Sequence, residues 1–129
     1  MTGYFAQIED ETIKNENFRK VLYTGKFSQL VVMSLLPGEE IGMEVHEHVD
    51  QFFRFEIGEG KAVLNGEETF FAADDVLIIP AGTNHNIINT SATDKLKLYT
   101  LYSPANHPEG TVHATKAEAM AAEEAEHGM

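Results

Sequence analysis

The chain has 129 residues, which is enough for one domain with its own core and leaves no room for a second module. Its 21 acidic residues outnumber 9 basic ones, and the formal net charge of −12 disfavours binding to nucleic acids or acidic membranes. There is no cysteine, so any metal must be bound through nitrogen and oxygen. The sequence shows no secretory leader and no membrane-spanning apolar run, and we expect a soluble cytoplasmic protein.

Short β-rich runs, separated by Gly and Pro, follow a polar and acidic arm at residues 1–17. The Asn65-Gly66 pair is the strongest hairpin signal among the turns. About nine strands with no helix between them predict an all-β jelly-roll barrel over residues 18–103. The expected strands are 18–24, 28–35, a region within 42–57, 61–64, 68–72, 76–79, 85–89 and 96–102.

The last segment, residues 104–129, differs from the barrel. It begins with a loop that contains two prolines, and His107 in this loop is expected on the surface. Thr115-Lys116-Ala117-Glu118 has the form of a capping box, which predicts a short Ala/Glu-rich helix to about Glu126. With few large apolar residues, this helix is expected to pack on the barrel surface.

Potential metal ligands gather in the stretch from Gly42 to Phe53. If residues 43–48 form a strand, Glu44, His46 and His48 lie on one face of it. A second histidine-bearing segment ends at His85. Because hairpins join the two segments, they predict one shared site inside the barrel, to which Gln51 can also turn.

The first segment resembles the first motif of the cupins, in which Gly and a short spacer precede His-x-His, three or four residues, Glu, six residues and Gly. Gln51 stands where the family has Glu, because six residues separate it from Gly58. His46 then takes the place of the second motif histidine, and Glu44 takes the place of the first.

The second cupin motif, Gly-x5-Pro-x-Gly-x2-His-x3-Asn, is matched by Pro80, Gly82, His85 and Asn89, with Asp74 in place of the first Gly. The resemblance implies a cupin double-stranded β-helix and a divalent metal ion such as Zn, Mn, Fe or Ni. The implied ligands are Glu44, His46, Gln51 and His85, similar to the Gln/His/Glu/His zinc site of cupin-type phosphomannose isomerases. In the alternative, His46 and His48 form a literal His-x-His pair.

Such a donor set permits several functions. We expect a metal-dependent isomerase-type enzyme acting on a small polar or sugar-like molecule in the barrel, with Glu44 and Gln51 as catalytic residues. The alternatives are an iron dioxygenase using Glu44, His46 and His85, or a binding protein without catalysis. Whether the protein is an enzyme is left open.

Two further expectations concern partners. By strand alternation Arg54, Lys95 and Lys97 face away from the interior, so no cation is expected to meet the ligand, and the ligand is expected to be neutral or modestly polar. An exposed strand edge or an apolar face such as that of Phe70 or Phe71 favours a homodimer.

Overall fold

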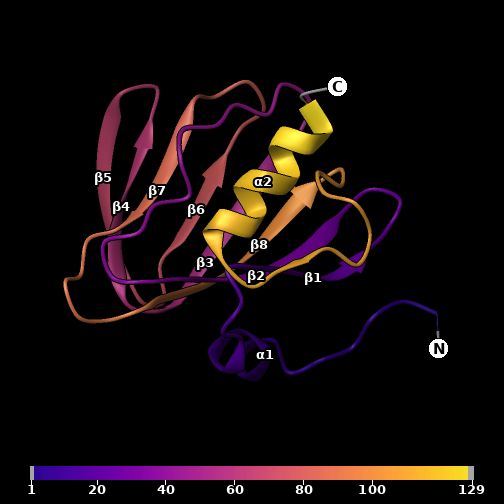
Figure 1. The fold of residues 1–129 in the computed structure, drawn as a ribbon, viewed down its shortest axis with the longest axis horizontal. Coiled ribbons are helices and arrows are strands. Elements are labelled where there is room, and N and C mark those ends of the chain that lie inside the picture. The colour runs from indigo at the N-terminus through magenta and orange to yellow at the C-terminus, as the bar shows by residue number, and fades with distance from the viewer. Residues whose placement is uncertain (1, 128–129) are drawn as a thin grey trace.

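The computed structural model describes residues 2–127, and Figure 1 shows a two-sheet barrel with one helix below it and one in front of it. Residue 1 and residues 128–129, which belong to the predicted terminal segments, lie outside the described residues. The elements are α1 (Ile8–Lys14), β1 (Arg19–Thr24), β2 (Gln29–Leu35), β3 (Asp50–Ile57), β4 (Glu59–Leu64), β5 (Glu67–Ala72), β6 (Val76–Ile79), β7 (His85–Asn89), β8 (Leu96–Ser103), β9 (Val112–His113) and α2 (Lys116–His127).

The larger sheet has six antiparallel strands in the order β6-β3-β8-β2-β1-β9. Alternation decides which side chains enter the barrel: in β3, Gln51, Phe53 and Phe55 are buried, while the residues between them are partly exposed. The inner face is apolar at one end and carries polar groups at the other. The sheet therefore supplies both a core and a polar interior wall.

The smaller sheet has the order β5-β4-β7 and faces the larger one. The predicted hairpin at Asn65-Gly66 is confirmed: both residues have positive φ, 49° and 83°, and the turn joins β4 to β5. Asp74, which replaces the first Gly of the second motif, also has a positive φ, 77°. Aspartate tolerates this conformation, which explains why the turn survives the replacement.

The arm at residues 1–17 contains α1, a helix that the sequence analysis did not predict. Lys97 Nζ donates to the carbonyls of Ile13 and Asn15 at 2.6 and 2.9 Å, and contacts Glu16 Oε1 at 2.9 Å. Lys97 therefore faces away from the interior, as expected, and holds the segment after α1 on the sheet.

The C-terminal helix α2 forms where the capping box predicted it. Glu118 N donates to Thr115 Oγ1 at 3.1 Å, and Ala114 N donates to Glu118 Oε2 at 2.7 Å. The short strand β9 pairs with β1 directly before the helix. This pairing brings α2 close to the inner side of β1.

Neither helix within residues 2–127 has the length and apolar character that a membrane span requires.

Candidate metal centre

Glu44 and His46 lie on an irregular segment, not on the strand that the sequence analysis assumed; β3 begins only at Asp50. Two isolated β-bridges, Glu40–Ile88 and Glu44–His85, tie this segment to β7, and Glu44 and His85 exchange reciprocal hydrogen bonds of 2.8 Å. Gly82 N donates to His46 O at 2.8 Å. The backbone thus joins the two histidine-bearing segments, as the sequence predicted, through isolated bridges in place of a regular ladder.

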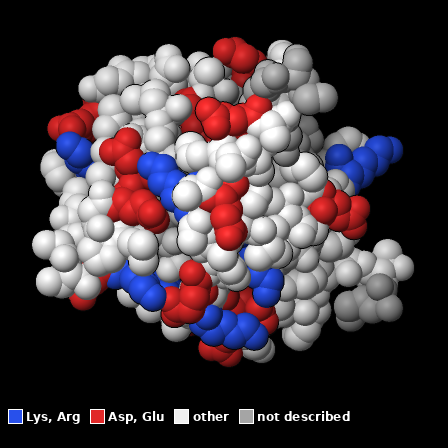
Figure 2. Space-filling model, in the orientation of Figure 1, with Lys and Arg blue, Asp and Glu red and all other residues white. Residues whose placement is uncertain are grey.

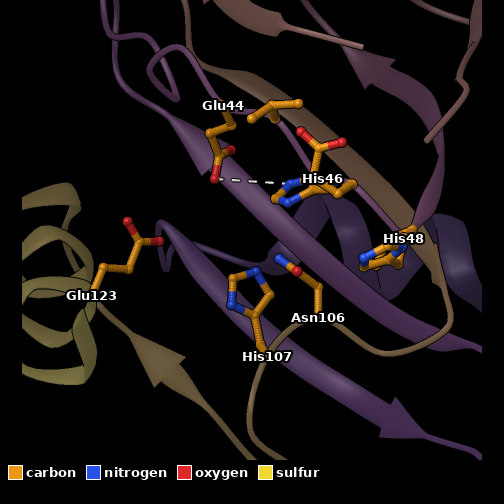
Figure 3. Close-up of a pocket in the computed structure, with 9 residues that line it drawn as sticks. Glu44, His46, His48, Asn106, His107 and Glu123 are labelled. Atoms are coloured by element: carbon orange, nitrogen blue, oxygen red, sulfur yellow. Dashed lines mark ion pairs between the residues drawn. The ribbon is translucent and has the colours of Figure 1, made fainter. Parts of the chain in front are cut away.

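Three potential ligand atoms, one each from Glu44, His46 and His85, lie within 4.8 Å of one another. Metal–ligand bonds of roughly 2.0–2.2 Å place ligand atoms about 3–4 Å apart, so small side-chain movements bring these atoms to one ion. Glu44 Oε2 and His46 Nε2 are 3.9 Å apart, and a dashed line joins the two side chains in Figure 3. The ring centroids of His46 and His85 are 5.2 Å apart. At 3.9 Å the carboxylate is too far away to form a hydrogen bond to the imidazole.

The side-chain hydrogen bonds leave ligand atoms free. His85 Nδ1 is 2.9 Å from the carbonyl of Thr83, and the Nδ1–H tautomer that donates this bond leaves the Nε2 lone pair available. Within the described chain, Nε2 of His85 and Nε2 of His46 are both buried without a hydrogen-bond partner. Buried polar atoms are rarely left unsatisfied, so these two nitrogens suit a group that binds imidazole lone pairs, such as a metal ion.

Gln51 lies on the inner face of β3 opposite Tyr102, whose ring edge meets the His46 ring at 5.9 Å between centroids. Its Nε2 donates to Thr100 Oγ1 at 3.0 Å. Its Oε1 is buried, and residues 2–127 offer it no hydrogen-bond partner. The amide is therefore oriented with its oxygen available as a ligand.

Burial shifts the pKa values of Glu44, His46 and His85. Desolvation raises the pKa of Glu44 to about 7, despite the opposing influence of the Arg19 charge. Desolvation, helped by the neighbouring His85 and Arg19, lowers the pKa of His46 to about 4, and burial lowers the pKa of His85. At neutral pH both imidazoles are neutral, the state that binds metal, and a divalent cation would favour the ionised Glu44.

The cluster opens into a pocket of about 500 Å³, which is large enough for a small organic molecule. Figure 3 shows residues from three regions of the chain around it. The lining includes Glu44, Val45, His46, Glu47, His48, Val49, Asn106, His107 and Glu123. His48 is exposed in a turn and is not among the three clustered ligand residues.

The sequence analysis placed His107 on the surface, and this prediction was wrong. The imidazole is partly buried beside the pocket, and its Nε2 is 3.2 Å from the hydroxyl of Tyr102. Burial lowers the pKa of His107 to about 3, with Arg19 and His46 contributing. The two prolines predict irregular structure in this loop, but they do not show where the loop folds. The sequence therefore did not reveal the buried position of His107.

Arg19 overturns the expectation that no cation reaches the interior. Its side chain is 1% exposed, lies on the inner face of β1 in phase with Val21, and pairs with Glu123 of α2 at 3.2 Å. Alternation with Val21 was the one signal in the sequence that could have revealed it. No local pattern connects Glu123, 104 residues away, to this position.

Two antiparallel sheets that face each other, with a His/Glu/His cluster between them, define the class of this protein: a small jelly-roll domain with a candidate metal site. The sequence profile of the family described as Cupin domain matches residues 31–102, so the chain belongs to the cupin family. The expected family and fold are thereby confirmed.

Particular relatives support this assignment. The chain is 48% identical over 128 residues to the uncharacterized protein YrkC of Bacillus subtilis, covering 94% of this chain and 68% of that protein. The crystal structure of BH2720 from Bacillus halodurans is 45% identical, with a TM-score of 0.89, and the match covers 92% of this chain and 93% of that one. A predicted oxalate decarboxylase from Thermotoga maritima is 28% identical, with a TM-score of 0.58, over 62% of this chain and 69% of that one.

Proposed function

We propose that this cupin is a metal-dependent enzyme that isomerises a small polar or sugar-like molecule. One observation carries the proposal: three buried ligand atoms, on His46, Gln51 and His85, lack partners in the described chain and accompany the carboxylate of Glu44 beside a pocket. Two imidazoles, a carboxylate and an amide suit a divalent ion. Such an ion would supply Lewis-acid polarisation of a carbonyl or hydroxyl oxygen.

The chain's own residues hold the donors in place. The carbonyl of Thr83 sets the tautomer of His85, and the hydroxyl of Thr100 orients the amide of Gln51. Glu44 is the carboxylate that reaches both the cluster and the pocket, and we assign it to catalysis on that basis. We assign Gln51 with it because its buried Oε1 lacks a hydrogen-bond partner among the described side chains. On the opposite wall, Asn106 and His107 offer hydrogen-bonding groups that can orient hydroxyls of the substrate.

A specific observation also favours a second candidate function. Glu44, His46 and His85 form the two-histidine, one-carboxylate set that non-heme iron oxygenases use. In that case Gln51 would orient a bound molecule through its free oxygen. A binding protein without turnover is the remaining alternative, since exchanging a carboxylate for the amide of Gln51 weakens one ligand.

Metal analysis tests the proposal directly. Protein purified without added metal and then dialysed against Zn²⁺, Mn²⁺, Fe²⁺ or Ni²⁺ should hold about one ion per chain, and His46→Ala and His85→Ala should abolish binding. His48→Ala is the matched control and should retain it, because His48 lies outside the ligand cluster. Absence of any bound ion in the wild type would refute the metal centre.

Activity assays then separate the candidate functions. Conversion of aldoses to ketoses, followed by NMR, supports the isomerase. Oxygen uptake by the Fe²⁺-loaded protein with small diketones or catechols supports the oxygenase. Gln51→Glu should raise metal occupancy in either case, and a protein that gains metal but turns over nothing would be a binding module.

We also propose a homodimer in the cytoplasm, formed through the outer face of the larger sheet. The apolar side chains of Ile78, Phe52, Leu101 and Leu30 lie in register across β6, β3, β8 and β2 and are partly or fully exposed. Phe71, one of the residues named from the sequence, is buried in the core, whereas Phe70 is 73% exposed on β5. The row on the larger sheet is therefore the more extended apolar surface.

A further inference from the structure

Arg19 is a buried cation whose hydrogen-bonding capacity is only partly used. Its side chain is 1% exposed, and its Nη1 donates to Glu123 Oε1 at 3.2 Å. Its Nε is buried, and no partner for it exists among the described side chains, which end at residue 125. A guanidinium presents several donors in a fork that fits a carboxylate through two parallel bonds, so a single contact leaves this geometry unused.

The partner of Arg19 stands at the wall of the pocket. Glu123 extends from α2 towards the space shared by His107, Asn106 and Glu44, as Figure 3 shows. Its side chain is 31% exposed and is therefore already partly in contact with solvent. Arg19 is not itself among the lining residues, so its guanidinium would meet the pocket only when Glu123 moves away from it. The charge of Arg19 is already close enough to influence Glu44 and His46.

The helix that carries Glu123 is weakly held. Ala119 is the buried residue of α2 among the residues with described side chains, and an alanine buries little apolar area. A pair between a buried arginine and a partly exposed carboxylate on such a helix is costly to desolvate, and the arginine would need another anion in place of the carboxylate. These are the properties expected of a temporary partner in a binding site.

We propose that Arg19 binds the carboxylate of the substrate and that Glu123 occupies this position until the substrate displaces it. The substrate class is then a small hydroxy or keto carboxylic acid. Its hydroxyl or keto oxygen faces the cluster of Glu44, His46 and His85. A carboxylate fits better than a phosphate, because the position already accepts a carboxylate and because Glu44, Glu47 and Glu123 surround the pocket with negative charge. This inference rests on the proposed metal-dependent function and specifies its substrate.

Matched pairs of small molecules test the inference. Glycolate, lactate, pyruvate and gluconate are titrated into the full chain, each beside its neutral amide, by calorimetry with and without added Zn²⁺. We expect at least one carboxylate to bind about 10-fold more tightly than its amide. Only the carboxylate can accept two parallel hydrogen bonds from the guanidinium of Arg19. Equal binding of every pair, or no binding of any acid, overturns the inference.

Three variants identify the residues responsible. Glu123→Gln removes the competing charge and should tighten carboxylate binding several-fold, whereas a purely structural ion pair would lose stability and leave binding unchanged. Arg19→Met should abolish the preference for the acid over the amide. Since Arg19→Met could unfold the chain, Arg19→Lys is the second variant: it keeps the charge, loses the fork, and should weaken carboxylate binding about 10-fold.

Measuring the Zn²⁺ content of the wild type and of each variant separates the proposed metal centre from the proposed role of Arg19. A wild type that binds no Zn²⁺ but still prefers carboxylates would refute the metal centre and retain the role of Arg19. A wild type that binds Zn²⁺ and shows no preference, or a Glu123→Gln variant that binds carboxylates more weakly, would refute the role of Arg19 and retain the metal centre.

Discussion

The orientation of one amide decides whether Gln51 can serve as a ligand. Its nitrogen donates to Thr100, and this bond turns the oxygen away from Thr100 as a free acceptor. Removing the partner of a metal ligand typically lowers metal affinity 10–100-fold. We therefore expect Thr100→Val to lower the affinity for Zn²⁺ about 10-fold, measured by competition with a chelator.

The matched control for this prediction is Thr69→Val, which makes the same chemical change on exposed strand β5. It should leave the affinity for Zn²⁺ unchanged. If Thr100→Val binds Zn²⁺ as tightly as the wild type, Gln51 is not held by Thr100 as a ligand.

His107 provides a pH-dependent prediction. Its pKa in the folded chain is about 3, below the unfolded value near 6.5, so its stabilising contribution is present above pH 6.5 and is lost as the pH falls towards 3. At pH 5 the unfolded state has gained most of its proton, which corresponds to a loss of about 2 kcal/mol from this residue.

Urea denaturation at pH 7 and pH 5 measures this loss. His107→Gln should lose less stability between the two values than the wild type does, while His48→Gln, at an exposed position, should behave as the wild type. NMR of the imidazole nitrogens should show His107 neutral at pH 5. A midpoint near 6.5 for His107 would contradict the prediction.

The sequence predicted side chains that follow a motif and missed those that depend on packing. Glu44, His46 and His85 were expected to converge, and the structure brings their ligand atoms within 4.8 Å. Arg19 and His107 were missed because their surroundings come from distant parts of the chain: α2 covers the former, and the loop after β8 folds the latter against Tyr102.

At the scale of an element, α1 depends on a single lysine of β8. Its seven residues are too few to form a stable helix alone, and Gln7 at its N-cap makes no side-chain capping bond. Lys97 supplies three contacts to the end of the helix and the residues after it. The helix was absent from the sequence analysis because this support lies more than 80 residues away.

Replacing this lysine should detach the segment. Lys97→Met leaves the carbonyls of Ile13 and Asn15 without their donor and removes one of the two lysines that contact Glu16, so it should lower the free energy of unfolding by about 2–3 kcal/mol. Trypsin should then cleave after Lys14 faster than in the wild type, as peptide mass analysis would show. Lys95→Met is the control, because Lys95 is exposed and pairs only with Glu16, and it should have little effect. Unchanged cleavage in Lys97→Met would show that other contacts hold α1.

At the scale of the whole molecule, the barrel was predictable because each strand repeats the same signal. Alternating burial in β3 and β8 sets the inner faces, and turn residues such as Asn65-Gly66 set the hairpins. Charge adds little to the architecture: Figure 2 shows acidic and basic side chains interspersed on the face in view. What the sequence could not give was the surface left uncovered once α1 and α2 are in place.

That surface is the basis of the last prediction. α1 covers the part of the outer sheet face around Val32, which is fully buried, but no helix among the described residues covers the row from Ile78 to Leu30. Exposed apolar side chains in register across four strands suit a self-complementary contact.

Light scattering should give twice the 14.3 kDa of one chain. Ile78→Glu should yield monomers, since it places two charges in the contact, whereas Phe70→Glu on the other sheet should leave the dimer intact. Dissociation by Phe70→Glu alone would move the interface to β5, and a monomeric wild type would refute the dimer.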